Sequence, residues 1–288
     1  MAGRAGLTFR AGRVNFEQGI YMKNKWLAVA PLSVCIVLTP QLLPAQTQTV
    51  ATAASATNAP SPVDHALGLL KASCDKIAAA KAFTFKTHSM VEVPSPVGGQ
   101  LINYFFVSEV GVQRPNKLFS KKTGDGPAFN VYYNGKTFSA VDEKLGLYAH
   151  IDAPPTLDEL IPFVMDRTGI YFPCADILYS NPYEKLTNGL TYAYWVGKSE
   201  VGGIECDHLA FSGPGIDWQI WVGPQQDPLP RRLSVTLTSE ERQPRFLVGF
   251  SEWDLKSSLP AKDFEFTAPK KLKEIEFRPQ TITTNATK

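Results

Sequence analysis

The sequence predicts a mainly β protein of the α+β class: a strongly curved antiparallel half-barrel of about eleven strands, capped by an N-terminal helix and a helical insertion. Three observations support this fold class. Apolar residues repeat every three or four positions near residue 70 and every second position afterwards. Turn-forming Pro, Gly and Asn-Gly sequences separate the later segments. A second helical pattern interrupts the strands near residue 160.

The chain begins with residues 1–45, which we interpret as a leader and signal peptide. Translation is expected to start near Met22, because two lysines follow it and precede the largely apolar 13-residue segment 26–38. Prolines end this segment, and cleavage is expected after Ala45. The segment is too short for a membrane-spanning helix. We therefore expect an exported, periplasmic protein.

Removing the leader reverses the sign of the net charge. Residues 1–45 carry five of the 29 basic residues and one of the 27 acidic residues, so the remaining chain has a net charge of −2 instead of +2. Without a basic stripe, a nucleic-acid partner is not expected. Residues 46–62 are rich in Ala, Thr, Ser and Pro and predict a flexible linker. Residues 63–280 are expected to form one domain, followed by a disordered tail, 281–288.

The first element of this domain is a helix that opens at Asp64. Leu67, Leu70, Cys74 and Ile77 lie at spacings of three and four residues. This spacing places them in one apolar stripe along a helix.

Strand patterns follow the helix, and about six antiparallel strands are expected before the insertion. The clearest are residues 101–112, 129–135 and 136–142, which are rich in β-branched and aromatic residues. Asn134-Gly135 lies between two of them and predicts a hairpin turn.

The insertion begins with residues 156–169, which have a helical pattern. Thr156 followed by Glu159 is a capping-box pattern, and the apolar residues after it give the helix a broad apolar face. Pro162 is expected to bend this helix or divide it in two. A second short helix is expected around residues 175–179.

About five more strands are expected after the insertion. Leu233, Val235 and Leu237 alternate with polar residues, which indicates a strand with one buried and one wet face. A sheet of about eleven strands tends to curl. The two amphipathic helices are the candidates for covering its apolar face, and a curled sheet capped in this way can enclose a ligand cavity.

The cysteines and one histidine are the residues to consider for covalent or metal chemistry. Cys74, Cys174 and Cys206 follow the leader, and three cysteines allow at most one internal disulfide. Cys206 and His208 are two residues apart on one predicted strand, where side chains lie about 6–7 Å apart, which is awkward for a nucleophile pair. The CxxC and HxxxH spacings of metal sites are absent from the sequence. We therefore expect no catalytic residue, metal or cofactor, and interpret His208 as a half-buried structural residue.

The candidate ligand-binding residues are apolar side chains on the predicted strands and on the insertion helix. Residues at these spacings also form ordinary cores, and they line a ligand site only where the sheet and helix leave unfilled volume. The candidates are Phe105, Tyr133, Trp195, Trp218 and Trp221 on strands, and Leu160, Val164 and Met165 on the helix.

Seven segments in order, within about residues 64–277, together resemble a family of predicted periplasmic proteins of unknown function. That family is thought to share a LolA-like fold, the fold of the outer-membrane lipoprotein carriers. The resemblance implies an unclosed β-barrel with a helical lid over a hydrophobic cavity. The segments are VQRP (112–115), YYNGKT (132–137), YAHIDAPPTLDEL (148–160), PCADILY (173–179), VGGIECDHLAF (201–211), DWQIWV (217–222) and PLPRRL (228–233).

Three functional hypotheses follow. The first is periplasmic binding or carriage of a lipid or other hydrophobic ligand without covalent chemistry, with an envelope lipoprotein or the membrane surface as a further partner. The second is a non-catalytic envelope interaction protein whose core is filled by its own side chains. The third is a hydrolase that uses His208 and a nearby carboxylate such as Asp207 or Asp217.

Overall fold

A computed structural model describes residues 61–95, 97–126 and 128–277 of the chain. The expected leader, nearly all of the expected linker and the expected tail lie outside these residues. Within the described ranges, none of the helices is both long enough and apolar enough to cross a membrane.

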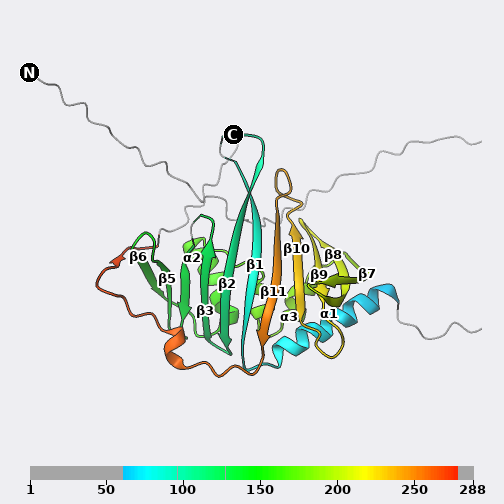
Figure 1. Ribbon diagram of the computed structural model, residues 1–288, viewed down its shortest axis with the longest axis horizontal. Helices are drawn as coiled ribbons and strands as arrows, with labels where there is room; N and C mark the ends of the chain where they lie inside the picture. Colours follow the sequence, from blue (N-terminus) through cyan, green and yellow to red (C-terminus); the bar gives the residue numbers. More distant parts are fainter. Residues whose placement is uncertain (1–60, 96, 127, 278–288) are drawn as a thin grey trace, which may run out of the picture.

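The described residues form a single curved sheet of twelve strands in the order β12-β6-β5-β4-β3-β2-β1-β11-β10-β9-β8-β7 (Figure 1). Six strands precede the insertion: β1 (Ala82–Pro94), β2 (Leu101–Gln113), β3 (Lys117–Gly124), β4 (Asn130–Tyr133), β5 (Thr137–Asp142) and β6 (Leu147–Asp152). Six follow it: β7 (Tyr192–Val201), β8 (Ile204–Gly213), β9 (Ile216–Val222), β10 (Pro230–Thr236), β11 (Arg245–Asp254) and β12 (Lys273–Glu274).

The curved antiparallel half-barrel predicted from the sequence is confirmed. The strand beyond the expected eleven is β12, which has two residues and pairs with β6 in parallel. Every other neighbouring pair is antiparallel. The predicted hairpin joins β4 to β5: Gly135 has φ +92°, and the Asn134 side chain accepts hydrogen bonds from the backbone of Lys136 and Thr137.

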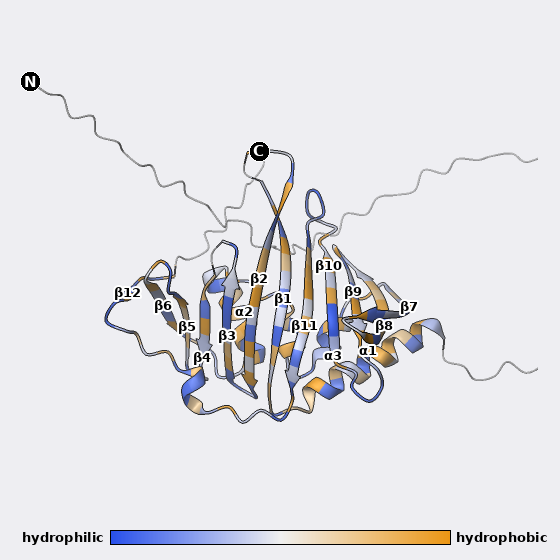
Figure 2. Cartoon of the chain, in the orientation of Figure 1, coloured by the Kyte–Doolittle hydropathy of each residue, from blue (hydrophilic) through white to orange (hydrophobic). Residues whose placement is uncertain are grey.

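Two antiparallel meanders meet in the middle of the sheet, where β1 pairs with β2 on one side and with β11 on the other. Apolar and polar residues alternate along the strands (Figure 2). On β1, Phe83 and Phe85 point to the concave face and join the core, while His88 lies on the opposite face. The sheet thus has one covered concave face and one convex face.

Helices cover the concave face. They are α1 (Pro62–Ala78), α2 (Leu157–Thr168), the 3-10 helix η1 (Ala175–Leu178) and α3 (Pro182–Thr187). Helix α1 packs against β7, β8 and β9, and buries Ala66, Leu70, Cys74 and Ile77. Of the predicted stripe, Leu67 is only partly buried, because Ala66 takes the position that faces the sheet.

The insertion follows the sequence prediction except in two details. The Thr156 hydroxyl accepts from the Glu159 backbone, which is the N-cap half of the predicted capping box, and donates to the Glu159 carboxylate. Of the two effects expected of Pro162, bending or division of the helix, division does not occur, because α2 is continuous through it. One lost backbone bond is tolerated there because the apolar face of α2 is held by the core, in which Leu160 and Val164 are fully buried. Helix α3 was not predicted.

The C-terminal strap, residues 255–277, crosses the lower rim of the sheet and wraps around the β6 edge (Figure 1). It contains the 3-10 helix η2 (Ala261–Phe264). Phe264 is fully buried, with its ring 5.8 Å from that of Phe119 on β3. Beyond β12, the ring of Phe277 lies 6.2 Å from that of Phe138, which belongs to the concave core. The strap therefore contacts both faces of the sheet.

The close packing under Phe119 explains a glycine on β2. A Cβ atom at position 111 would lie 2.1 Å from the Phe119 ring, so only glycine leaves room for that ring to lie flat on the sheet. Phe264 then covers the other side of the ring.

Phe264→Ala is expected to lower the free energy of unfolding by about 3–5 kcal/mol, since it leaves a cavity over Phe119. Urea denaturation measures this change. The matched control is Phe266→Ala on the same strap, where the ring is only partly buried and a smaller loss is expected. A loss below about 1 kcal/mol for Phe264→Ala would show that the strap does not belong to the cooperative fold.

Candidate functional site

A cavity of about 100 Å³ lies between the concave face of the sheet and the insertion. The sheet supplies most of its wall, from the central strands β1, β2, β3, β4 and β11. The sheet residues are Phe85, Thr87, Ser89, Val91, Phe106, Ser108, Val110, Leu118, Ser120, Lys122, Val131, Val248 and Phe250, and Phe129 precedes β4.

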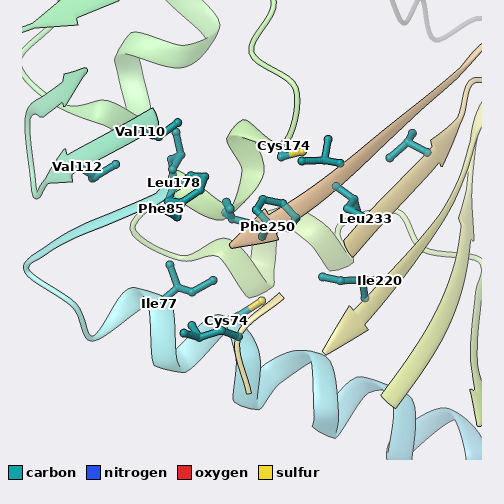
Figure 3. Packing of buried hydrophobic residues seen from close by; sticks show 14 of the residues in the cluster. Cys74, Ile77, Phe85, Val110, Val112, Cys174, Leu178, Ile220, Leu233 and Phe250 are labelled. Atoms are coloured by element: carbon teal, nitrogen blue, oxygen red, sulfur yellow. The ribbon is translucent and has the colours of Figure 1, made fainter. Parts of the chain in front are cut away.

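The opposite wall is a loop, residues 169–174, which we name the cover loop. It connects α2 to η1, and Ile170, Tyr171, Phe172, Pro173 and Cys174 line the cavity, together with Leu178 of η1. Figure 3 shows Leu178 beside Phe85 and Val110, with Cys174 near Phe250. The cavity therefore has one wall of hydrogen-bonded strands and one wall without regular secondary structure.

The backbone of the cover loop is not hydrogen-bonded to the sheet within the described residues. Its two ends adopt left-handed backbone conformations, with φ +70° at Gly169 and +64° at Cys174. The left-handed region is accessible to glycine but uncommon for cysteine. The loop is thus held by its side chains and by two sharp turns, which makes it the least constrained part of the cavity wall.

The insertion is attached to the sheet just below the cavity by Arg114, directly after β2. Its Nη1 donates a 2.7 Å hydrogen bond to the carbonyl oxygen of Leu178. The guanidinium carbon lies 5.6 Å from the centre of the Phe83 ring, and burial lowers the pKa of Arg114. This bond anchors η1 to the sheet, whereas the backbone of the preceding cover loop makes no hydrogen bond to the sheet among the described residues.

A row of polar side chains crosses the cavity wall. Thr87 on β1 is paired with Ser108 on β2, and Ser108 is paired with Lys122 on β3. The strand register therefore places two hydroxyls and one ammonium group side by side among apolar residues. Burial lowers the pKa of Lys122.

The eight ligand-binding candidates from the sequence lie outside the wall of this cavity. Tyr133, Leu160, Val164 and Trp218 are buried in the core. Trp195 is partly buried against that core, and its ring is 5.3 Å from that of His65 on α1. These five residues therefore belong to the core or pack against it.

The remaining three candidates face outward. Phe105 is 58% exposed on the convex face, and Met165 is 45% exposed on α2. Trp221 stacks on His208, with 4.0 Å between the ring centres, on the convex side of β8 and β9. Alternation explains the position of Phe105, because the adjacent Phe106 is the one of the pair that points into the cavity.

The residues considered for catalysis make hydrogen bonds to other groups. His208 Nε2 is hydrogen-bonded to the side-chain oxygen of Gln219 at 2.9 Å. Asp207 is buried and accepts bonds from Trp195 Nε1 and Lys198 Nζ. Cys206 is buried, and all three described cysteines are free thiols. These contacts do not form the nucleophile and base pair that covalent catalysis requires.

The polar row and the cover loop were not predicted from the sequence. A signal for the row was present, because Thr87, Ser89, Ser108 and Ser120 interrupt apolar positions of the concave face. Their strand register could not be read from one sequence, since a shift of one residue would turn all of them outward.

The model of a family described as "Predicted periplasmic protein (DUF2092)" matches residues 66–278. This match confirms the family resemblance predicted from the seven segments and the expected periplasmic location. A search of curated proteins finds no match.

Similar solved structures include an uncharacterized conserved protein from Thermus thermophilus, at 9% identity and a TM-score of 0.44, covering 74% of this chain and 99% of that one. The lipoprotein LppX from Mycobacterium tuberculosis is 13% identical, with a TM-score of 0.38 and coverage of 68% and 98%. A LolA superfamily protein from Nitrosomonas europaea is 10% identical, with a TM-score of 0.32 and coverage of 70% and 97%. These likenesses are too distant to carry a functional argument.

Cys174 reports on movement of the cover loop. Burial raises the pKa of Cys74 to about 12 and raises that of Cys174 as well, so both thiols are unreactive in the closed structure. Iodoacetamide at pH 8, followed by peptide mass spectrometry, is expected to label Cys174 before Cys74 and Cys206, because loop opening exposes only Cys174. Equal labelling rates at the three sites would show that exposure requires global unfolding.

Proposed function

The chain belongs to the DUF2092 family of predicted periplasmic proteins, and we propose that it binds a lipid or another hydrophobic ligand on the concave face of the sheet, beneath the cover loop. Binding uses no covalent chemistry. The observation that carries this proposal is the construction of the cavity: a fixed apolar wall of strands faces a loop whose backbone makes no hydrogen bond to the sheet within the described residues.

The cavity is smaller than the pockets in which proteins usually bind small ligands. Pockets for small ligands usually have volumes of about 300–1,000 Å³, and a cavity of about 150 Å³ holds one benzene molecule. The cavity of about 100 Å³ between sheet and insertion therefore accepts only a short part of an acyl chain. A longer chain is accommodated when the cover loop moves away from the sheet.

The free energy of transferring an alkyl chain from water into the cavity also indicates that the cover loop has to move. Each buried methylene contributes about 0.8 kcal/mol, so about four buried carbons contribute about 3 kcal/mol, which is weaker than a dissociation constant of about 1 mM. About ten buried carbons contribute about 8 kcal/mol, which is in the micromolar range before the cost of opening the loop is subtracted. Useful affinity thus depends on displacement of the cover loop.

A second candidate function is interaction with another envelope protein through the convex face. The observation that favours it is a row of three cross-strand neighbours, Leu247, Met90 and Phe105, in which Phe105 is 58% exposed and Leu247 is 37% exposed. Crosslinking in the intact envelope tests this candidate. A stable partner that is lost in Phe105→Ser, with ligand binding unchanged, would support it.

Filling the cavity is expected to weaken binding. Ser89→Phe adds a phenyl ring to a cavity wall of about 100 Å³ and should weaken binding of the dye N-phenyl-1-naphthylamine at least about tenfold. Dye fluorescence titration measures this change. His88→Phe places the same ring on the convex side of β1 and is the matched control, expected to bind like the unmodified protein. Equal binding by both variants would place the dye elsewhere and reject the proposed site.

Protein isolated from its own envelope is expected to retain a bound hydrophobic molecule. Extraction with organic solvent followed by mass spectrometry detects it, and the Ser89→Phe protein prepared in parallel should yield less. The absence of any extracted or exchangeable hydrophobic molecule from the unmodified protein would count against carriage of a ligand.

A further inference from the structure

Lys122 is the single charged residue in the wall of the cavity, and no carboxylate lines that wall among the described residues. Within the same part of the chain, Lys122 has no ion-pair partner within 4.0 Å. A partly buried ammonium group without an opposite charge is unusual, because desolvation without compensation is unfavourable. A lysine at this position of β3 therefore needs a compensating interaction.

Two aromatic rings hold the ammonium group. Lys122 Nζ lies 3.8 Å from the centre of the Phe106 ring and 5.8 Å from that of Phe129, and both rings line the cavity. Cation–π contacts favour the charged form but leave the three N–H donors free. The contacts thus position the charge without satisfying its hydrogen bonds.

The neighbours of Lys122 offer more donors. The hydroxyls of Thr87, Ser108 and Ser120 line the same wall, and none of them makes a hydrogen bond to another described side chain or backbone group. They are also absent from the fully buried polar atoms without a partner, so they reach open volume. Together with Lys122, they form a group of free donors at one place in an otherwise apolar cavity.

Ordinary surface lysines behave differently. Lys121, the preceding residue on β3, is exposed on the convex face with its Nζ 5.0 Å from the centre of the Phe119 ring. Its stem covers an aromatic ring while its charge stays in water, as is usual for lysine. Lys122 points to the opposite face, where residues of the cover loop line the same cavity, so its side chain is more enclosed than that of Lys121.

We infer that Lys122 binds the anionic head group of a single-chain amphiphile, a carboxylate or a phosphate, with the hydroxyls of Thr87 and Ser108 as additional donors. This inference rests on the proposed function, because it specifies the ligand class of the same cavity. The alkyl chain extends from Lys122 along the apolar residues of the concave face toward Phe250, beneath the cover loop. An anion supplies the opposite charge that the cavity wall lacks.

Binding of three ligands with the same chain tests the inference. Dodecanoate, dodecyl phosphate and dodecan-1-ol are titrated into the full chain at pH 7.5, below their aggregation concentrations, by isothermal calorimetry. The unmodified protein is expected to bind at least one of the anions about tenfold or more tightly than the alcohol, as one charge-assisted hydrogen bond allows. The anion that binds more tightly identifies the head group as carboxylate or phosphate.

Three variants assign the preference to one side chain. Lys122→Met should remove the preference for the anion over dodecan-1-ol, because it keeps the apolar stem and removes the charge. Lys122→Arg keeps the charge and should keep a preference. Lys121→Met removes the same charge from the convex face and should behave like the unmodified protein.

The outcomes separate this inference from the proposed function. Binding of all three ligands with equal affinity by the unmodified protein overturns the inference and leaves hydrophobic binding in place. Failure of all three to bind rejects the proposed function itself. An equal loss of preference in Lys121→Met and Lys122→Met would assign the effect to overall charge and overturn the role of Lys122. Should Lys122→Met fail to fold, Lys122→Arg and the comparison of ligands on the unmodified protein decide.

Discussion

The pairing of β1 with β11 is the interaction on which the whole structure depends. It joins two meanders that are separated in sequence by the helical insertion, and it brings Ser89 opposite Val248, far away along the chain. Its register decides which residues of the central strands face the helices. A shift of one residue would move the apolar residues of β1 to the convex face and turn Lys86 and His88 inward. The cavity wall and the core on both sides of this pair follow from this register, and the pairing of β2 with β1 and β3 then sets the polar row.

Local sequence signals predicted the elements well. The N-cap bond of Thr156 and the Asn134-Gly135 turn act within a few residues, and both are present in the structure. The candidate site was predicted less well, because cavity residues are defined by contacts between distant segments. Adjacent aromatic residues such as Phe105 and Phe106 are equivalent in composition, and only the register decides which of them points inward. Trp218, a candidate ligand contact from sequence, instead stacks on Phe211 within the core.

The cavity combines groups that oppose stability with a wall whose backbone makes no hydrogen bond to the sheet among the described residues. Lys122 and the neighbouring hydroxyls occupy concave positions where apolar residues would pack better, and burial lowers the pKa of the lysine. Cys174 adopts an uncommon backbone conformation at the end of the cover loop. Such departures from good packing concentrate at functional sites in proteins. Elsewhere the concave face is conventional, with Phe83, Leu209 and similar residues fully buried.

The C-terminal strap also covers part of one edge of the sheet. Strand β6 gains its outer neighbour from Lys273 and Glu274, near the end of the described chain. Without this pairing, the backbone groups of Leu147 and Tyr148 would be free to pair with another chain. The strap therefore shortens the exposed edge of β6 and limits edge-to-edge association of two sheets.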